Sequence, residues 1–241
     1  MILCLDCGNT RLKWGVRDGQ RWVASGALMH ADIPQLATVL SEWPRAQHVI
    51  GCNVASEERG TSVEIALGFP VRWIKASAAR RGVTNSYDDP TALGADRWAA
   101  LIGAHAMRCG NAVVVLAGTA TTIDVLDAQG RFCGGLILPG IGLMTASLAQ
   151  GTARLPSVPG IYRPLPRNTR DAIASGAVHA TLGAIERMHE QLPPGEPSIC
   201  LLSGGAAGFL QPYLRQPYRQ VDNLVLEGLA TISAYESSDD A

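Results

Sequence analysis

The sequence predicts an α/β fold built from two related halves, and three observations support this prediction. Short apolar strands alternate with segments of helical periodicity along the 241 residues. The order strand, Gly-containing turn, strand, Asp-containing turn, strand occurs twice, as LDCGNTRLKWGVRDG and as LAGTATTIDVLDAQG. A hydrophobic content of 47% with 17% charged residues is typical of a globular chain with a sizeable core. We therefore divide the chain into an N-terminal half, 1–110, and a C-terminal half, 111–241.

The N-terminal half begins with a predicted antiparallel meander. Its strands lie at 2–6, 11–16 and 21–27, and its turns contain Gly8 and the pair Asp18-Gly19. Helical spacing predicts helices at 33–43 and 56–67, and apolar runs predict strands at 48–54 and 71–76. After a polar loop at 80–91, a further helix begins near Ala95.

The C-terminal half repeats the meander and then becomes helical. Its strands are expected at 112–117, 123–126 and 132–138, with turns at 118–122 and 127–130. The remaining elements are a helix through Leu148, a Pro-rich connection at 156–166, a helix at 171–191, a strand at 198–202 and a helix at 224–235. The last strand ends in Ser203-Gly204-Gly205, which we expect on the adenosine side of a cleft that holds both Gly-containing turns.

Charge and hydropathy exclude several classes of function. Twenty basic and 21 acidic residues give a formal charge of -1, so no uniform basic field is present to hold nucleic acid or an anionic membrane. No apolar run reaches the roughly 18 residues of a membrane span. The start, MILCLDCGNT, also lacks the basic and long apolar regions of a signal peptide. We expect a cytoplasmic protein without nucleic-acid or membrane partners.

The six cysteines are interpreted as reduced thiols, mostly in the core, because they are scattered and embedded in apolar stretches. Cys4 and Cys7 form a C-x-x-C, but they lie in a predicted strand, whereas the redox motif opens a helix. The five histidines show no metal-ligand spacing and are interpreted as surface or core residues. The sequence also lacks the signatures of P-loop and dinucleotide folds, serine hydrolases and zinc proteases.

The first turn has the residues that a phosphate or metal-phosphate needs. Gly8 allows close backbone approach, Asn9 and Thr10 supply donors, and Asp6 could hold a Mg²⁺-bound water. Lys13, one of two lysines in the chain, follows the turn and suggests a point-charge contact. Two alternatives stay open: the turn only closes a hairpin, and the lysine is a solvated strand residue.

Two further segments are candidates. The turn GTATT at 118–122 recurs in the equivalent place of the second half, although ordinary β-propensity also explains Thr121 and Thr122. In GADR at 94–97, Asp96 could accept a proton from an attacking hydroxyl while Arg97 pairs with a substrate carboxylate or phosphate. Alternatively, Asp96 is a helix N-cap and Arg97 a surface charge.

Several motifs in register resemble the type III pantothenate kinases, a family that includes proteins called Bvg accessory factor. They are D-x-G-N-T at 6–10, Y-x(6)-L-G-A-D-R at 87–97, G-T-A-T-T at 118–122, G-G-x-I-x-P-G at 134–140 and N-T-x-x-A-I-x-S-G at 168–176. The resemblance spans nearly the whole chain. It implies the duplicated two-domain fold of the acetate and sugar kinase, heat-shock and actin superfamily, which is ribonuclease H-like.

The resemblance also implies an activity: ATP-dependent phosphorylation of pantothenate to 4'-phosphopantothenate, the first step of coenzyme A biosynthesis. It makes Asp96 the general base. It assigns the ATP phosphates, with Mg²⁺ at Asp6, to Asp6, Cys7, Gly8, Asn9, Thr10, Arg11, Leu12, Lys13 and, from the second half, Thr119. It assigns pantothenate to Tyr87, Gly94, Ala95, Asp96, Arg97 and Thr169, with Arg97 facing the carboxylate.

One position departs from the family pattern. The family commonly has an aspartate two residues before G-T-A-T-T, as a ligand for an activating K⁺ or NH₄⁺, and this chain has Leu116. A leucine side chain cannot coordinate a cation, which puts this dependence in doubt. Two alternatives stay open for Asp124 on the following strand: it compensates for the missing ligand, or it is a surface residue. The resemblance further implies a homodimer, for which the apolar face of the helix at 171–191 could serve, or that face could be core.

Two other functions are compatible with the same fold. One is a catalytically reduced accessory protein on the same fold, which the loss of aspartate at position 116 favours. The joint presence of Asp6, Asp96, Arg97 and Thr119 argues for the enzyme. The other is a kinase of the same superfamily that acts on another small hydroxy acid.

Overall fold

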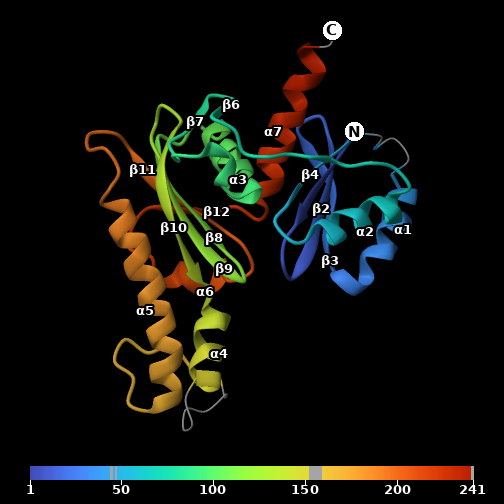
Figure 1. Ribbon diagram of the computed structural model, residues 1–241. Helices are drawn as coiled ribbons and strands as arrows, with labels where there is room; N and C mark the ends of the chain where they lie inside the picture. The colour runs from blue at the N-terminus through green and yellow to red at the C-terminus, as the bar shows by residue number, and fades with distance from the viewer. Residues whose placement is uncertain (44–45, 47, 152–158, 240–241) are drawn as a thin grey trace. The chain divides into compact units, whose positions relative to one another are not determined.

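The computed structural model describes residues 1–43, 46, 48–151 and 159–239, with side chains of the last helix described to Ala234 (Figure 1). The chain forms two compact units. The first unit contains Met1–Arg108 and Asn223–Ala241, and the second contains Cys109–Asp222. The first unit is therefore discontinuous in sequence.

The first unit has a five-stranded sheet in the order β3-β2-β1-β4-β5. The strands β1 (Ile2–Cys7), β2 (Arg11–Asp18) and β3 (Arg21–Met29) form the expected antiparallel meander. The strand β4 (His48–Asn53) runs parallel to β1, and β5 (Arg72–Trp73) runs parallel to β4.

Each face of this sheet is covered by helices. Leu3, Leu5 and Cys7 alternate onto one face and form a core with η1 (His30–Gln35), α1 (Leu36–Ser41) and α2 (Glu57–Leu67). The same alternation sends Cys4 and Asp6 to the opposite face, which contacts α3 (Ala95–Ala106) and α7 (Leu224–Asp239). The polar end of β1 therefore lies on the face that carries α3.

Two predicted elements of this unit differ from the structure. The helix expected at 33–43 is a 3₁₀ turn followed by a short α-helix, and Pro34, which lacks an amide N–H, lies inside the turn. The strand expected at 71–76 is reduced to two residues. The Glu64 carboxylate accepts hydrogen bonds from the Val71 amide and the Trp73 indole, each at 3.0 Å, so Val71 does not extend the ladder.

The final helix belongs to the first unit, which corrects the sequence-based division at residue 110. In Figure 1, α7 (red) lies beside the blue strands β2 and β4, and its contacts include β1, β4 and α3. A Cβ at Gly228 would collide with the Ala99 carbonyl oxygen, and a Cβ at Gly103 would lie 2.8 Å from the Leu224 carbonyl oxygen. These two glycines therefore allow α3 and α7 to pack backbone to backbone.

The predicted polar loop at 80–91 contains short elements of its own. A hairpin joins β6 (Ala79–Arg80) to β7 (Val83–Asn85) through Arg81 and Gly82, which have φ values of 53° and 79°. A 3₁₀ turn, η2 (Pro90–Ala92), follows and is capped by the Asp89 side chain. It leads directly into α3.

The second unit repeats the strand topology of the first. Its order is β10-β9-β8-β11-β12, formed by β8 (Asn111–Ala117), β9 (Ala120–Leu126), β10 (Arg131–Pro139), β11 (Ser198–Ser203) and β12 (Tyr218–Gln220). The first three strands form an antiparallel meander, and β11 and β12 are added in parallel. The predicted duplication is confirmed at the level of strand order and direction.

The helices of the second unit follow its meander. They are α4 (Ile141–Gly151), α5 (Thr169–His189), α6 (Ala207–Leu210) and the 3₁₀ turn η3 (Gln211–Tyr213). α4 and α5 lie side by side, and α5 covers β8 and β9 (Figure 1). The first residues of the expected Pro-rich connection, 156–158, lie outside the described residues. Among the described helices, none combines the length and apolarity of a membrane span.

Candidate functional site

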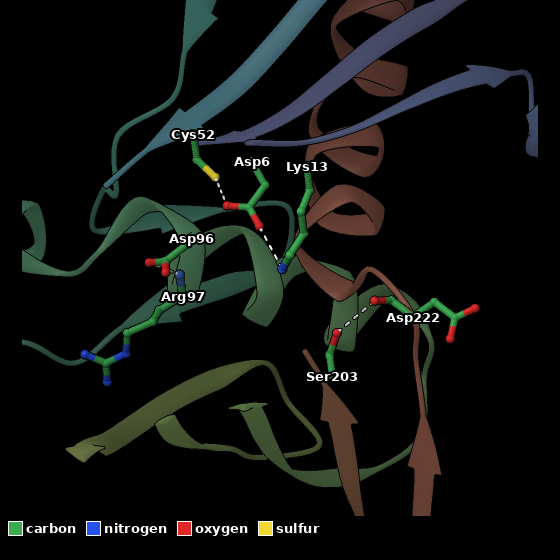
Figure 2. Close-up of polar contacts among 7 residues, drawn as sticks. All are labelled: Asp6, Lys13, Cys52, Asp96, Arg97, Ser203 and Asp222. Carbon is green, nitrogen blue, oxygen red and sulfur yellow. Dashed lines mark hydrogen bonds and ion pairs between the residues drawn. The ribbon is translucent and has the colours of Figure 1, made fainter. Parts of the chain in front are cut away.

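The Asp6 carboxylate occupies the end of β1 and is 6% exposed. Strand pairing sets its neighbours, because Lys13 on β2 and Cys52 on β4 are the residues directly opposite Asp6. The Lys13 ammonium lies 3.3 Å from Oδ2, and the Cys52 thiol lies 3.6 Å from Oδ1 (Figure 2). One buried carboxylate is thus held between a cation and a thiol.

The thiols near Asp6 stay protonated. Burial raises the pKa of Cys52 well above its ordinary value, and the charge of Asp6 raises it further. The same two causes raise the pKa of Cys7 to about 11. A protonated Cys52 can donate to Asp6, and neither thiol has the thiolate character that redox or soft-metal chemistry needs.

The turn after β1 presents polar groups at its tip and apolar ones at its base. Asn9, Thr10 and Arg11 are exposed, whereas the side chains of Cys7 and Leu12 are fully buried in the core. The Gly8 amide donates to the Arg11 carbonyl oxygen at 3.3 Å. Cys7 and Leu12 can therefore meet a ligand only through their backbone.

Asp96 lies in the first turn of α3, on the element that covers the Asp6 face. Its Oδ1 accepts the Arg97 backbone N–H at 2.8 Å. The N-cap position is Gly94, so the alternative that Asp96 is the N-cap is wrong. A Cβ at Gly94 would come within 2.8 Å of Asp96 Oδ1, so the glycine leaves room for this carboxylate.

The pKa of Asp96 is raised from its ordinary value. Burial is the main cause, and the negative charge of Asp6 adds to it, while the Arg97 backbone N–H acts in the opposite direction. The negative charge of Asp6 therefore acts on the Asp96 carboxylate within the same unit. A carboxylate with a raised pKa is a stronger base than an ordinary aspartate, as a proton acceptor at neutral pH requires.

Arg97 is buried, with 3% exposure, so the alternative that it is a surface charge is wrong. Its Nη1 donates to the Tyr87 hydroxyl at 2.8 Å, and its guanidinium lies 5.6 Å from the centre of the Tyr87 ring. Both residues come from the segment that the sequence singled out. A buried guanidinium oriented by a phenol is suited to a planar anion such as a carboxylate.

The remaining predicted residues belong to the second unit and are described within it. Thr119 is exposed in the turn between β8 and β9, and Thr169 is the exposed first residue of α5. Leu116 is half-buried near the end of β8. Asp124 on β9 is fully buried, so the surface alternative for this residue is wrong.

The turn before β9 is shorter than predicted, since Thr121 and Thr122 already lie in the strand. Both are buried, and among the described residues neither hydroxyl has a hydrogen-bond partner. At the end of β11, the Ser203 hydroxyl lies 3.5 Å from the Asp222 carbonyl oxygen (Figure 2).

Two contacting residues were not singled out by the sequence. Cys52 meets Asp6 because β4 pairs with β1, and His30 contacts the carbonyl oxygens of Gly8 and Asn9. Neither stands in a motif, and only the strand register and the path of the chain after β3 bring them to the turn. The described residues contain no group of three or more His, Cys, Asp or Glu side chains placed to hold a metal ion by themselves.

Comparison with known proteins adds independent information. The family model of type III pantothenate kinases matches residues 2–191. A type III pantothenate kinase of Aromatoleum aromaticum is 50% identical over 241 residues, covering 99% of this chain and 100% of the relative. A second, from Dechloromonas aromatica, is 50% identical over 232 residues, covering 95% and 97%.

Solved structures agree on the fold. A Campylobacter jejuni protein assigned to the Baf family of transcriptional activators matches with a TM-score of 0.66 and 22% identity, over 98% of this chain and 100% of that one. A Sinorhizobium meliloti protein assigned as a 2-dehydro-3-deoxygalactonokinase matches with a TM-score of 0.63 and 13% identity, over 98% and 99%. The fold is the duplicated, ribonuclease H-like fold of the acetate and sugar kinase, heat-shock and actin superfamily.

Proposed function

Because the chain belongs to the type III pantothenate kinases, we propose that it transfers the γ-phosphoryl group of ATP to the primary hydroxyl of pantothenate. The product is 4'-phosphopantothenate, the first intermediate of coenzyme A biosynthesis. The observation that carries this proposal is the pair Asp6 and Asp96, which the sheet and α3 bring within electrostatic reach of each other. The substrate is inferred from family membership, and the role of a proton acceptor is inferred from this pair of aspartates.

Asp96 is the general base in this proposal. Its carboxylate accepts the proton of the pantothenate hydroxyl as the hydroxyl oxygen bonds to the γ-phosphorus, while the bond between the γ-phosphorus and the β,γ-bridging oxygen breaks and ADP leaves. Burial and the charge of Asp6 raise its pKa, which strengthens it as a proton acceptor. The Arg97 backbone N–H holds Oδ1 and so orients the carboxylate. The step needs little else from the protein, since phosphoryl transfer is mostly positioning and charge neutralisation.

In this proposal the turn after β1 binds the ATP phosphates. Lys13 supplies a positive charge beside Asp6, and the exposed tip of the turn supplies backbone and side-chain donors. Asp6 offers a hard carboxylate oxygen, which fits Mg²⁺, because Mg²⁺ in kinases is held by one or two carboxylates together with phosphate oxygens and water. When bound there, Mg²⁺ would neutralise charge on the phosphate oxygens.

In this proposal pantothenate is bound by the segment 94–97 together with Tyr87. Arg97 faces the pantothenate carboxylate, because a guanidinium pairs with a carboxylate through two parallel hydrogen bonds. The Tyr87 hydroxyl accepts a hydrogen bond from Arg97 Nη1 at 2.8 Å and so helps to orient the guanidinium. The accessory-protein alternative has no need of this arrangement of buried charges.

In this proposal the side chain at position 116 does not hold a monovalent cation, because the half-buried Leu116 side chain has no oxygen. Asp124, although fully buried, lies on the neighbouring strand β9 and is the candidate for a replacement ligand. The enzyme therefore depends on K⁺ or NH₄⁺ only if Asp124 takes over this role.

The test is a phosphorylation assay with purified protein, ATP, Mg²⁺ and pantothenate, run with K⁺, with NH₄⁺ and with Na⁺ alone. Turnover of pantothenate, and not of other small hydroxy acids at the same concentration, is the expected result. Equal rates in the three salts would show that the cation site is lost. A folded protein without turnover in any salt would refute the kinase assignment for this chain.

We also propose a homodimer formed through the second unit. Large apolar side chains are exposed on β10 and α4, namely Leu136, Ile137, Leu143 and Leu148 at 40%, 66%, 48% and 40%. An apolar groove of about 310 Å³ between α4 and α5 is lined by Met144, Leu148, Ile173 and Gly176 among others. Exposed apolar area of this kind marks an interaction surface, and a second copy of the chain covers it in this proposal.

Light scattering after size-exclusion chromatography tests the dimer. The native chain should elute as a dimer, and Leu148→Glu should shift it to monomer. Ile65→Glu is the matched control, since Ile65 is 76% exposed on α2 of the first unit and should leave the dimer intact. A monomeric native chain would rule this interface out.

A further inference from the structure

His30 lies immediately after β3 and contacts the turn at the end of β1, although 21 and 22 residues separate them in sequence. Its Nε2 is 2.9 Å from the Gly8 carbonyl oxygen and 3.2 Å from the Asn9 carbonyl oxygen. Since a carbonyl oxygen only accepts, Nε2 must carry the proton and donate to both. One imidazole N–H therefore draws two successive carbonyl groups toward itself.

The orientation of the carbonyls sets the orientation of the amides. In a planar trans peptide the C=O and N–H groups point in opposite directions. The Gly8 carbonyl shares its peptide with the Asn9 amide, and the Asn9 carbonyl shares its peptide with the Thr10 amide. With both carbonyls turned to His30, both N–H groups are directed away from the imidazole. Successive N–H groups that point the same way form an anion-binding nest.

The other backbone groups at the base of the turn are held by the sheet and the loop after β4. The Cys7 carbonyl oxygen accepts the Val54 amide at 3.1 Å, and the Gly8 amide donates to the Arg11 carbonyl oxygen at 3.3 Å. These bonds fix the two ends of the turn, and His30 contacts the carbonyl oxygens of the two central peptides. Without the His30 N–H, each of these peptides could rotate and turn its carbonyl oxygen toward a bound anion. The partial negative charge of that oxygen would then repel the anion.

We propose that His30 is a positioning residue for nucleotide binding, which orients the Asn9 and Thr10 amides toward the triphosphate by holding the Gly8 and Asn9 carbonyls. The ligand class is a polyphosphate chain, and the inference rests on the proposed role of the turn as the ATP phosphate site. His30 itself lies on the carbonyl side of the turn and does not touch the phosphates. Its Nδ1 is buried and has no hydrogen-bond partner among the described residues, so Nε2 is the atom that acts.

The experiment compares two substitutions of His30 that differ in one donor. His30→Leu keeps much of the volume and removes the N–H, whereas His30→Gln retains an N–H at a similar reach. His48→Leu is the matched control, because His48 is exposed at the start of β4. For each protein, calorimetry gives the Kd of Mg²⁺–AMP-PNP and of tripolyphosphate, and steady-state kinetics give KM for ATP and for pantothenate. Circular dichroism and Tm verify folding.

We expect His30→Leu to raise both Kd values and the KM for ATP by about tenfold or more, the effect of one or two lost hydrogen bonds. The KM for pantothenate should change by less than about twofold, and His30→Gln should recover most of the loss. Native affinity in His30→Leu would overturn the proposal. So would a loss that His30→Gln shares equally, since that pattern indicates packing rather than donation.

The two proposals fail in different ways. If the native protein binds tripolyphosphate but phosphorylates no pantothenate, the kinase assignment fails and the His30 comparison is still decided by the Kd values. If the native protein phosphorylates pantothenate and His30→Leu does so with unchanged KM for ATP, only the role of His30 fails. A native protein that binds neither polyphosphate refutes both.

Discussion

Asp6 and Asp96 are two aspartates of one unit with different surroundings, and this difference separates their roles. Asp6 has a cation on one oxygen and a thiol donor on the other, at 3.3 Å and 3.6 Å. Asp96 has backbone donors, and burial together with the charge of Asp6 raises its pKa. A carboxylate with a raised pKa is typical of a proton acceptor at an acid–base site. Asp96 is thus suited to accept a proton, whereas Asp6 lies beside the Lys13 ammonium.

Substitution of the proposed base gives the first prediction. Asp96→Asn keeps Oδ1 and therefore the hydrogen bond from the Arg97 amide, but it cannot accept a proton. We expect kcat to fall by about 10² to 10⁴ with native circular dichroism and a KM for ATP close to the native value. Initial rates over both substrates measure this. Unchanged turnover would remove Asp96 from the role of base.

The pH dependence of stability gives the second prediction. A carboxyl group whose pKa is higher in the folded than in the unfolded state favours folding most at low pH, and this contribution is lost as the pH rises through the folded pKa. Asp96 has a raised pKa, so its ionised form opposes folding at neutral pH. The Tm of Asp96→Asn minus the native Tm should therefore increase between pH 4 and pH 7. A difference independent of pH would contradict the raised pKa.

Some of these residues could be predicted from the sequence, and others could not. Asp6, Lys13, Asp96 and Arg97 stand in contiguous motifs, so their chemistry could be predicted. The burial of Arg97 could not be predicted from its motif, nor could its hydrogen bond to Tyr87, which lies ten residues away across a loop and a 3₁₀ turn. Cys52 and His30 are isolated residues that tertiary pairing brings to the turn.

At the scale of elements, the approach of α3 to α7 depends on glycine, and this gives the third prediction. Gly228→Ala would place a methyl group against the Ala99 carbonyl oxygen, and rigid backbone on both helices prevents relief. We expect destabilisation by about 1–3 kcal/mol or more, as for an overpacked core. Urea unfolding followed by near-ultraviolet circular dichroism measures it.

Gly183→Ala on α5 is the matched control for this substitution, because a Cβ there would meet no atom within 4 Å. A helical glycine with free space should gain about 0.5–1 kcal/mol when replaced by alanine. The two substitutions are therefore expected to have opposite signs. If Gly228→Ala were as well tolerated as Gly183→Ala, α3 and α7 would not pack as closely as described.

The elements themselves were predictable where local signals agree. Both meanders follow from apolar strands separated by Gly- or Asp-containing turns, and α3 and α5 follow from helical periodicity. The length of β5 was overestimated, because Val71 and Ile74 are buried but do not extend the strand. Thr121 and Thr122 were assigned to a turn, although their β-propensity correctly indicated a strand.

At the scale of the whole molecule, the duplicated topology is visible in the sequence but the path of the last helix is not. The repeat of the meander predicts two similar sheets, and both have the strand order third, second, first, fourth, fifth. The apolar pattern of residues 224–235 predicts a helix but does not indicate which of the two sheets this helix covers. The α3 and α7 glycines and the contacts of Glu227 with Arg17 and Trp22 decide that it closes the first unit.

The discontinuous first unit gives the last prediction, that a chain ending at Asp222 cannot fold this unit. α7 buries Leu224, Leu226, Leu229 and Ile232 at 0%, 1%, 0% and 0% exposure. Each such side chain contributes about 1.5–3 kcal/mol, so their joint loss is comparable to the whole stability of a domain, about 5–15 kcal/mol. The truncated chain should bind the dye ANS, lose near-ultraviolet circular dichroism and lose AMP-PNP binding.

Glu227→Gln in the full chain is the control, since it removes the ion pair with Arg17 at 2.9 Å but keeps the apolar side of the helix. It should remain folded and bind AMP-PNP, because an ion pair of partly exposed groups contributes only about 0–1 kcal/mol. Adding the peptide 223–241 to the truncated chain should restore part of the binding if packing of the helix is what is missing. A truncated chain with native spectra and affinity would show instead that residues 1–108 form the first unit without α7, and that the helix is an appendage rather than part of its core.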